Sequence, residues 1–98
     1  MSHIEFDWDP VKYKKNFLNH GISFEEAQTV FYDENARLIP DIMHSDQEDR
    51  FIILGYSSRA KLLAVCHCYR KNNEIIRLIS ARKATKSETN QYYKFNHG

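Results

Sequence analysis

A basic side chain stands inside an apolar run of the sequence. In EIIRLIS, Arg77 alternates with isoleucines as on a strand. Burying an unpaired guanidinium is costly, so Arg77 needs either a carboxylate partner or a solvent-filled cleft. Arg82, Lys83 and Lys86 follow at the end of the run. A helix that begins there adds backbone N–H groups and the positive end of its dipole, and both favour a phosphate. The sequence therefore predicts a cleft, lined by these four cations, that binds a polyanion.

Histidine is the side chain best suited to proton transfer near neutral pH. His67 stands in the preceding apolar run, where it alternates with Val65 and Tyr69. It would lie near Arg77 if the pairing register brought both to one face of a sheet, and the sequence does not give that register. Structural roles compete with chemical ones for each of these residues. His67 could be a hydrogen-bonded histidine at the edge of the core, and Arg77 could be bridged to an acid of the N-terminal half. Lys83 and Lys86 could lie on a solvated face.

Other chemistries have weaker support in the sequence. No G-x-x-x-x-G-K-[ST], G-x-G-x-x-G or H-E-x-x-H motif occurs, so nucleotide-dependent and zinc-protease activities are not expected. Cys66 and Cys68, two apart on an expected strand, are expected to be reduced, interior and inert. The string HSDQED, residues 44–49, lacks the glycine spacing of a calcium loop. We expect a polar loop there, with no metal and no cofactor.

The informative feature of the charge is its distribution along the chain. The formal net charge is +1, but residues 1–49 carry 4 Lys and Arg against 11 Asp and Glu, a net charge of −7, and residues 50–98 carry 10 against 2, a net charge of +8. This asymmetry predicts either an anionic partner for the basic part or two halves that neutralise each other. The sequence has no apolar run long enough for a membrane span, and its acidic start is unlike a signal peptide. We expect a cytoplasmic protein.

The N-terminal part of the sequence predicts a short strand and two helices. Ile4–Trp8 alternates weakly between apolar and polar residues. Asp9 followed by proline is typical of a helix start, because the aspartate caps the first turn and proline needs no N–H partner there. Gly21 is typical of the helix end. The SFEE segment after it, beginning at Ser23, is a capping box that opens a second helix.

The rest of the chain predicts four strands and a last helix. The strand candidates are Ala36–Ile42, Phe51–Tyr56, Leu62–Tyr69 and Glu74–Ala81. Pro40 favours an edge position for the first of them, and the short SSRAK and KNN connections favour antiparallel neighbours. Thr85 and Glu88 form a further capping box. We expect one α+β domain over residues 1–98, with N-terminal helices packed on a small antiparallel sheet and a C-terminal helix.

Three segments together resemble a known family over nearly the whole chain. They are, in order, FDWDPVKYKKNFLNHGISFEEAQTVFYD, HSDQEDRFIILGYSSRAKLLAVCH and IIRLISARKATKSE. Within them, HG-x-SF-x-EA, E-x-R-x-x-x-x-G with Arg50, and R-x-I-S-A-R-x-A with Arg77 and Arg82 are hallmarks of the BrnT toxins of type II toxin-antitoxin systems. The chain is similar to this family in its motifs and in their order.

The resemblance implies a fold, an activity and a partner. BrnT toxins are compact RelE-like ribonucleases that arrest growth by cleaving RNA, and a BrnA antitoxin holds them inactive. BrnA is a ribbon-helix-helix DNA-binding protein, and the toxin-antitoxin complex represses its own operon. We therefore expect an RNA substrate, a BrnA-like partner, and contact with operator DNA only through the complex.

Arginines suit the cleavage chemistry that this resemblance implies. RNA can be cut without metal when its own 2′-OH attacks the adjacent phosphorus, and the enzyme then moves protons and stabilises the phosphorane charge. The guanidinium fork holds two phosphate oxygens at once. We expect Arg77 and Arg82 to stabilise the phosphorane, with Arg50 assisting.

The acid or base and the wider RNA contacts are less tightly specified by the sequence. His67 is the expected acid or base, with Glu48 and Glu88 as alternatives. The expected RNA-binding side chains are Lys83, Lys86 and Arg59. The same basic side chains also fit a different function, a non-catalytic module that binds nucleic acid or an acidic protein surface.

Overall fold

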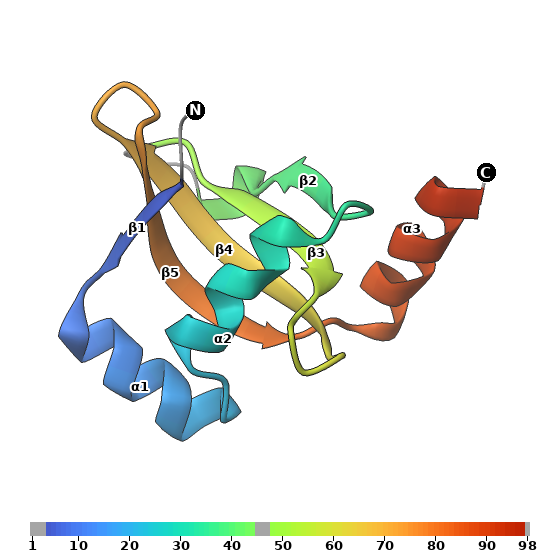
Figure 1. The fold of residues 1–98 in the computed structure, drawn as a ribbon, viewed down its shortest axis with the longest axis horizontal. Helices are drawn as coiled ribbons and strands as arrows, with labels where there is room; N and C mark the ends of the chain where they lie inside the picture. The colour runs from blue at the N-terminus through green and yellow to red at the C-terminus, as the bar shows by residue number, and fades with distance from the viewer. Residues whose placement is uncertain (1–3, 45–47, 98) are drawn as a thin grey trace.

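A strand, two helices, four strands and a last helix follow one another in the computed structural model, which describes residues 4–44 and 48–97 (Figure 1). This order confirms the predicted elements and the α+β class. The strands are β1 (Glu5–Trp8), β2 (Arg37–Pro40), β3 (Phe51–Tyr56), β4 (Leu62–Arg70) and β5 (Ile75–Lys83). The helices are α1 (Pro10–His20), α2 (Phe24–Thr29) and α3 (Lys86–His97), with short 3-10 helices η1 (Val30–Tyr32) and η2 (Ile42–His44).

The five strands form one mixed sheet in the order β1-β5-β4-β3-β2. Strands β2 to β5 pair antiparallel, and β2, which contains Pro40, lies at the predicted edge. β1 instead runs parallel to β5, so the prediction of an antiparallel sheet is wrong for the first strand. A tight connection dictates the relative direction of consecutive strands only. β1 and β5 are the first and last strands of the chain, and no such connection joins them.

An extra residue in β5 decides which arginines share a face of the sheet. The pairing of β5 with β4 slips at Ile79, which stands between the partners of Cys66 and His67. Strict alternation would place Arg77 and Arg82, five positions apart, on opposite faces. The bulge cancels this difference. Both arginines therefore lie on one face, opposite to the buried core side chains of β5.

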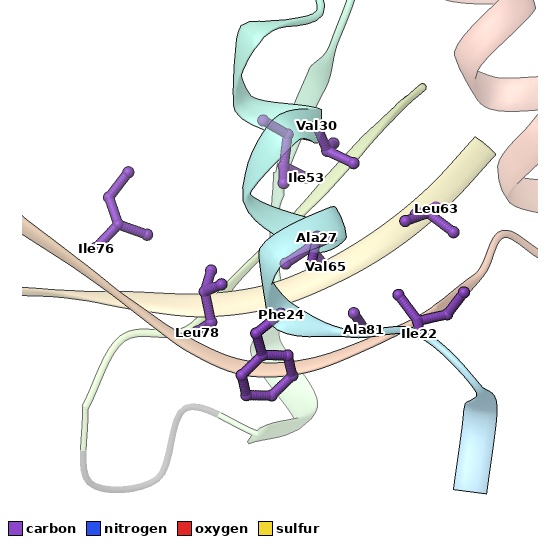
Figure 2. Close-up of a cluster of buried hydrophobic side chains, with 10 residues drawn as sticks. All are labelled: Ile22, Phe24, Ala27, Val30, Ile53, Leu63, Val65, Ile76, Leu78 and Ala81. Carbon is purple, nitrogen blue, oxygen red and sulfur yellow. The ribbon is translucent and has the colours of Figure 1, made fainter. Parts of the chain in front are cut away.

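The other face of the sheet carries the main hydrophobic core, which α2 and η1 cover (Figure 2). The serine of the predicted capping box, Ser23, accepts a hydrogen bond from the N–H of Glu26 at 3.1 Å and starts α2. The buried side chains of the core are Ile22, Phe24, Ala27, Val30, Ile53, Leu63, Val65, Ile76, Leu78 and Ala81. Burial of these apolar side chains fixes α2 across the sheet.

A buried amide joins α1 to β5. The side chain of Asn16, which is 5% exposed, accepts from the N–H of Ala81 at 3.0 Å and donates to the carbonyls of Ala81 and Ile22 at 3.0 and 3.1 Å. β1 pairs with β5 only from Ile75 to Leu78. Asn16 therefore takes the place of a strand partner beyond the end of β1 and satisfies backbone groups that would otherwise be buried unpaired.

α3 lies apart from α1 and α2 (Figure 1) and packs through Tyr92 on Leu54 and Ala64, on the face of the sheet that carries the arginines. The predicted capping box is present. The N–H of Glu88 donates to Thr85 Oγ1 at 3.1 Å, and the N–H of Thr85 donates to Glu88 Oε1 at 2.9 Å. Within residues 4–44 and 48–97, no helix is long and apolar enough to cross a membrane.

Asp33 connects α3 to the sheet. Its Oδ2 accepts from the Tyr92 hydroxyl at 2.7 Å and from the N–H of Tyr56 at 2.8 Å, and its Oδ1 accepts from the N–H of Asn35 at 2.9 Å. Burial alone would raise the pKa of Asp33, but these three hydrogen bonds lower it overall. The carboxylate is therefore held in its charged form, and it joins η1, β3 and α3 at one point.

Candidate functional site

A hollow of about 320 Å³ lies on the arginine-bearing face of the sheet. Arg50, directly before β3, and Arg82, near the end of β5, both line it. Asp41 and His44 line it from the connection between β2 and β3. The remaining lining side chains are Met43, Ile52, Ala64, Cys66, Ile79 and Ser80. The hollow thus combines two guanidinium groups, one carboxylate and one imidazole above an apolar strand surface.

Arg82 is held by α3. Its Nη1 and Nη2 atoms donate to the two carboxylate oxygens of Glu88 at 2.7 and 3.0 Å. This bidentate hydrogen bond raises the pKa of Arg82 and lowers the pKa of Glu88, despite partial burial of both. The capping residue of α3 therefore also fixes the plane of a guanidinium that lines the hollow.

Arg77 shares the face of Arg82 but does not line the hollow. Its Nε donates to Asp7 Oδ1 at 3.0 Å, on the neighbouring parallel strand, and this hydrogen bond raises the pKa of Arg77. The two residues are register partners in β1 and β5. Arg77 therefore does not share this hollow with Arg82, because a bridge to an acid of the N-terminal half holds Arg77 at the β1 side of the sheet.

His67 lies on the core face of the sheet, away from Arg77 and the hollow. It is completely buried, and its ring contacts Phe31, Phe51 and Tyr69. Nδ1 lies 3.1 Å from the carbonyl of Val65, and burial lowers the pKa of the imidazole although that contact raises it. The register pairs His67 with a core residue of β5. The register that the sequence left open therefore separates His67 from Arg77, and the ring packs in the core instead of reaching the hollow.

Glu48 lies between two arginines, of which Arg50 lines the hollow. Its Oε2 is 3.2 Å from Nη1 of Arg70, and its Oε1 is 4.0 Å from Nε of Arg50. Glu48 itself does not line the hollow. It stands beside Arg50, and Arg70, which sequence reasoning missed, is its nearer partner. The arrangement suits a carboxylate that orients Arg50 better than one that reaches a substrate.

The predicted RNA-binding cations are exposed and lie outside the hollow. Lys83 follows Arg82 directly on β5 and so points to the opposite face. Lys86 is the first residue of α3, and Arg59 lies in the turn between β3 and β4. None of the three is brought against Arg50. Their positions extend positive charge along the molecule without adding to the hollow.

The connection after β2 supplies side chains that sequence reasoning did not assign to the site. His44 Nδ1 lies 3.0 and 3.1 Å from the two oxygens of Asp41. The Cys66 thiol donates to Asp41 Oδ2 at 3.7 Å, and burial, followed by the charge of Asp41, raises the thiol pKa to about 11. Cys66 and Cys68 are free, and the raised pKa of each agrees with the predicted inert thiols. The signal in the sequence was His44 standing six residues before Arg50.

The described residues offer little for metal binding. Among residues 4–44 and 48–97, no group of three or more His, Cys, Asp or Glu side chains is placed to hold a metal ion. Asp46, which belongs to the HSDQED string, lies outside the described residues.

Comparison with known families identifies the group to which these features belong. The sequence model of the family described as the ribonuclease toxin BrnT, of type II toxin-antitoxin systems, matches residues 8–88. The chain belongs to the BrnT family. A crystal structure of the Brucella abortus ribonuclease toxin BrnT superposes on it with a TM-score of 0.65 at 22% sequence identity, covering 86% of this chain and all of that one. Comparison with curated protein sequences gives no match.

The BrnT match includes every residue that lines the hollow, from Asp41 to Arg82, and ends at Glu88, the carboxylate that holds Arg82. As a BrnT-family member, the chain is a ribonuclease toxin of a type II toxin-antitoxin system. The likeness to the Brucella abortus structure shows that the mixed sheet and its helices form a BrnT-like fold.

Proposed function

We propose that this BrnT-family toxin is a metal-independent endoribonuclease in which the 2′-OH of the RNA attacks the adjacent phosphorus. The observation that carries the proposal is the presence of Arg50 and Arg82 in one hollow. Attack by the 2′-OH adds charge to the phosphorane oxygens, and donors already in position stabilise that charge. The nucleophile belongs to the substrate, so the protein has to supply only orientation, charge and proton transfer.

Arg82 keeps donors for a phosphate while it is bound to Glu88. A guanidinium has five N–H donors. Two of them bind Glu88, and another is directed at the carbonyl of Lys83 at 3.4 Å. Because Glu88 already fixes the guanidinium plane, little side-chain entropy is lost when RNA binds. Arg82 is therefore the residue to which we assign the scissile phosphate. Arg50, which lines the same hollow, assists it, and Glu48 orients Arg50.

Basic side chains outside the hollow are assigned to the flanking RNA. Arg77 lies on the same face as Arg82 and is partly exposed, so we assign it a phosphate next to the scissile one. Lys83, Lys86 and Arg59 are exposed and contribute to non-specific attraction of the RNA backbone.

Cleavage of a purified RNA in excess EDTA tests this function. The wild-type chain should generate 2′,3′-cyclic phosphate and 5′-hydroxyl ends, which mass spectrometry identifies. Arg50→Ala and Arg82→Ala should each lower the single-turnover rate by about 100- to 1,000-fold, because each removes a charge-stabilising donor. Lys12→Ala, an exposed cation on α1, is the matched control and should cleave like wild type.

Two results would contradict the proposed chemistry. One is a wild-type chain that shifts RNA in a gel but leaves it intact, as a non-catalytic binding module would. The other is full cleavage by both arginine variants. Thermal melting of each variant separates lost chemistry from lost folding, which matters for Arg82 because its removal leaves Glu88 without its bidentate partner.

We also propose that a BrnA-like ribbon-helix-helix antitoxin inactivates the chain by covering the hollow, and that the toxin is RelE-like and acts in the cytoplasm. The rim of the hollow supports a protein partner there, since Ile42 and Met43 of η2 are 81% and 83% exposed. Large apolar side chains at a surface mark contact sites. Operator DNA would be contacted through the antitoxin of the complex.

Expression in cells gives a direct test of the toxin role. The chain alone should arrest growth, and co-expression of a BrnA-like antitoxin from a neighbouring gene should restore growth. Operator DNA should be retarded in a gel by the complex and not by the toxin alone. An antitoxin that binds the toxin while RNA cleavage continues would contradict masking of the hollow.

A further inference from the structure

We propose that His44 is a catalytic residue of this chain, the base that takes the proton from the attacking 2′-OH, and that Asp41 positions it. The inference rests on the RNA cleavage proposed above. It assigns the proton-transfer role to a side chain of η2, in place of the histidine on β4 that the sequence indicated.

The two side chains form a carboxylate-imidazole pair at the rim of the hollow. Both oxygens of Asp41 lie 3.0 to 3.1 Å from His44 Nδ1, and both residues line the same hollow as Arg50 and Arg82. The Asp41 side chain is 11% exposed, whereas the His44 side chain is 68% exposed. The carboxylate thus stands behind the ring and leaves the imidazole accessible to a substrate.

The partner of Nδ1 determines which nitrogen is free to accept a proton. An ionised carboxylate only accepts hydrogen bonds, so the contact with Asp41 requires a proton on Nδ1. In the neutral ring the lone pair then belongs to Nε2. A histidine whose Nδ1–H is held by a carboxylate presents Nε2 in a fixed tautomer, which is the arrangement a general base needs.

Contacts from three directions hold Asp41 in place. Its backbone N–H donates to the carbonyl of Arg50 at 2.8 Å, and its own carbonyl accepts from the N–H of His44 at 3.2 Å. The Cys66 thiol donates to the carboxylate, and its raised pKa of about 11 keeps it protonated for that purpose near neutral pH. The backbone of Asp41 is therefore fixed to the residue before β3, and its carboxylate is fixed to β4.

The other candidate acids and bases are less available. His67 is completely buried on the opposite face of the sheet. Glu48 is bound by Arg70, and Glu88 is bound through both oxygens by Arg82. Among the described residues, His44 is the histidine that lines the hollow, and the guanidinium groups of Arg50 and Arg82 line it as well.

The proposed step balances in atoms and protons. Nε2 of His44 takes the 2′-OH proton as the bond from O2′ to phosphorus forms. The bond from phosphorus to O5′ breaks, and O5′ takes a proton from solvent water. The resulting hydroxide is neutralised by the imidazolium, which returns His44 to its starting state. The products are a 2′,3′-cyclic phosphate and a 5′-hydroxyl.

The test compares His44→Gln, His44→Ala and Asp41→Asn with His20→Gln, the same change at an exposed histidine of α1. Single-turnover cleavage of RNA in EDTA gives the rate, and fluorescence anisotropy with an uncleavable 2′-deoxy analogue gives the affinity. The His44 variants should lose about 100- to 10,000-fold in rate, and Asp41→Asn should lose roughly 10-fold or more, all with unchanged affinity. Added imidazole should restore part of the rate to His44→Ala, and His20→Gln should behave like wild type.

Each outcome of the test either supports the role of His44 as the base or overturns it. If His44→Gln cleaves at the wild-type rate, the inference is overturned while the proposed ribonuclease function stands. If affinity falls in parallel with the rate, His44 binds RNA and is not the base. If the wild-type chain itself does not cleave RNA, the proposed function fails and this inference fails with it.

Discussion

Arg77 and Arg82 are each held by a carboxylate, but their ion pairs differ in kind. Glu88 binds both Nη atoms of Arg82, and its side chain is 13% exposed. Asp7 meets only Nε of Arg77, with the two side chains 42% and 36% exposed. An exposed ion pair of that type contributes about 0 to 1 kcal/mol. A phosphate from RNA therefore competes with Asp7 far more easily than with Glu88.

The difference predicts a particular kinetic effect for Arg77. Because Arg77 lies outside the hollow, its phosphate contact should be equal in the ground state and the transition state. Arg77→Ala should then raise KM roughly 5-fold, about 1 kcal/mol of binding, and leave kcat nearly unchanged. Asp7→Asn, which releases the guanidinium, should lower KM. Steady-state cleavage of a short fluorescent RNA measures both. A fall in kcat at constant KM would contradict this and show that Arg77 contacts the scissile phosphate in the transition state.

The sequence predicted only part of the grouping of side chains at the hollow. Arg50 and Arg82 were assigned to one site from their motifs, and the hollow contains both. His44 was interpreted as part of a polar loop, because the HSDQED string lacks the glycine spacing of a calcium loop. Its pairing with Asp41, three residues earlier, has no signal in the sequence. His67 was assigned the role of base because it stands on a strand next to that of Arg77 and could have shared its face. Only the register of β4 and β5 shows that it lies in the core.

At the scale of elements, features set by neighbours in the chain were predictable and long-range pairing was not. The N-cap of Ser23 and the capping box of Thr85 and Glu88 start helices where the sequence placed them, because a cap is satisfied within three residues. The carboxylate of Glu26 instead accepts from the Ser57 hydroxyl. The parallel pairing of β1 and the bulge at Ile79 have no local signal. They arise from how strands far apart in sequence fit together. The bulge is the feature that brings Arg82 to the face of Arg77.

The amide bridge from α1 to β5 predicts a large stability effect at a single position. Asn16→Ala leaves the N–H and the carbonyl of Ala81 without a partner in a buried region. Each unsatisfied group costs about 1 to 3 kcal/mol, so the free energy of unfolding in urea should fall by roughly 2 to 4 kcal/mol. Asn19→Ala, an exposed position on the same helix, should change it by about 0.5 kcal/mol or less. Equal stability of the two variants would show that the bridge contributes nothing.

At the scale of the whole molecule, some of the opposite charges of the two halves of the chain form ion pairs with each other within the fold. The pairs Asp7 with Arg77 and Glu48 with Arg70 join acids of residues 1–49 to bases of residues 50–98. Mutual neutralisation is therefore one reason for the asymmetry. Arg82 is different, because its carboxylate comes from the basic half itself. A carboxylate of α3 fixes the position of the Arg82 guanidinium, so the packing of α3 on the sheet helps to form the hollow.

A few contacts fasten α3 to the rest of the chain. Tyr92 donates to Asp33, Glu88 binds Arg82, and the Arg37 guanidinium lies 4.6 Å from the centre of the Phe95 ring. Two of these contacts depend on ionised carboxylates. The pKa of Glu88 is lowered, first by its hydrogen bond from Arg82. The pKa of Asp33 is lowered by hydrogen bonds that outweigh its burial.

These lowered pKa values predict that α3 loosens in acid. A carboxyl with a lower pKa in the folded state than in the unfolded state gives stability that is complete above the unfolded pKa, about 4. That stability is lost as the pH falls through the folded pKa. The protection factors of the amides along α3, which are corrected for the intrinsic exchange rate at each pH, should therefore fall below about pH 4, before those of β4 and β5 respond. Glu88→Gln should lower the free energy of unfolding at pH 7 by about 1 to 2 kcal/mol and flatten its dependence on acid pH. Glu34→Gln, an exposed control, should do neither. If α3 and the central strands lose protection together in the wild-type chain, the helix is not an independently fastened part of the site, and Arg82 must be held by the fold as a whole.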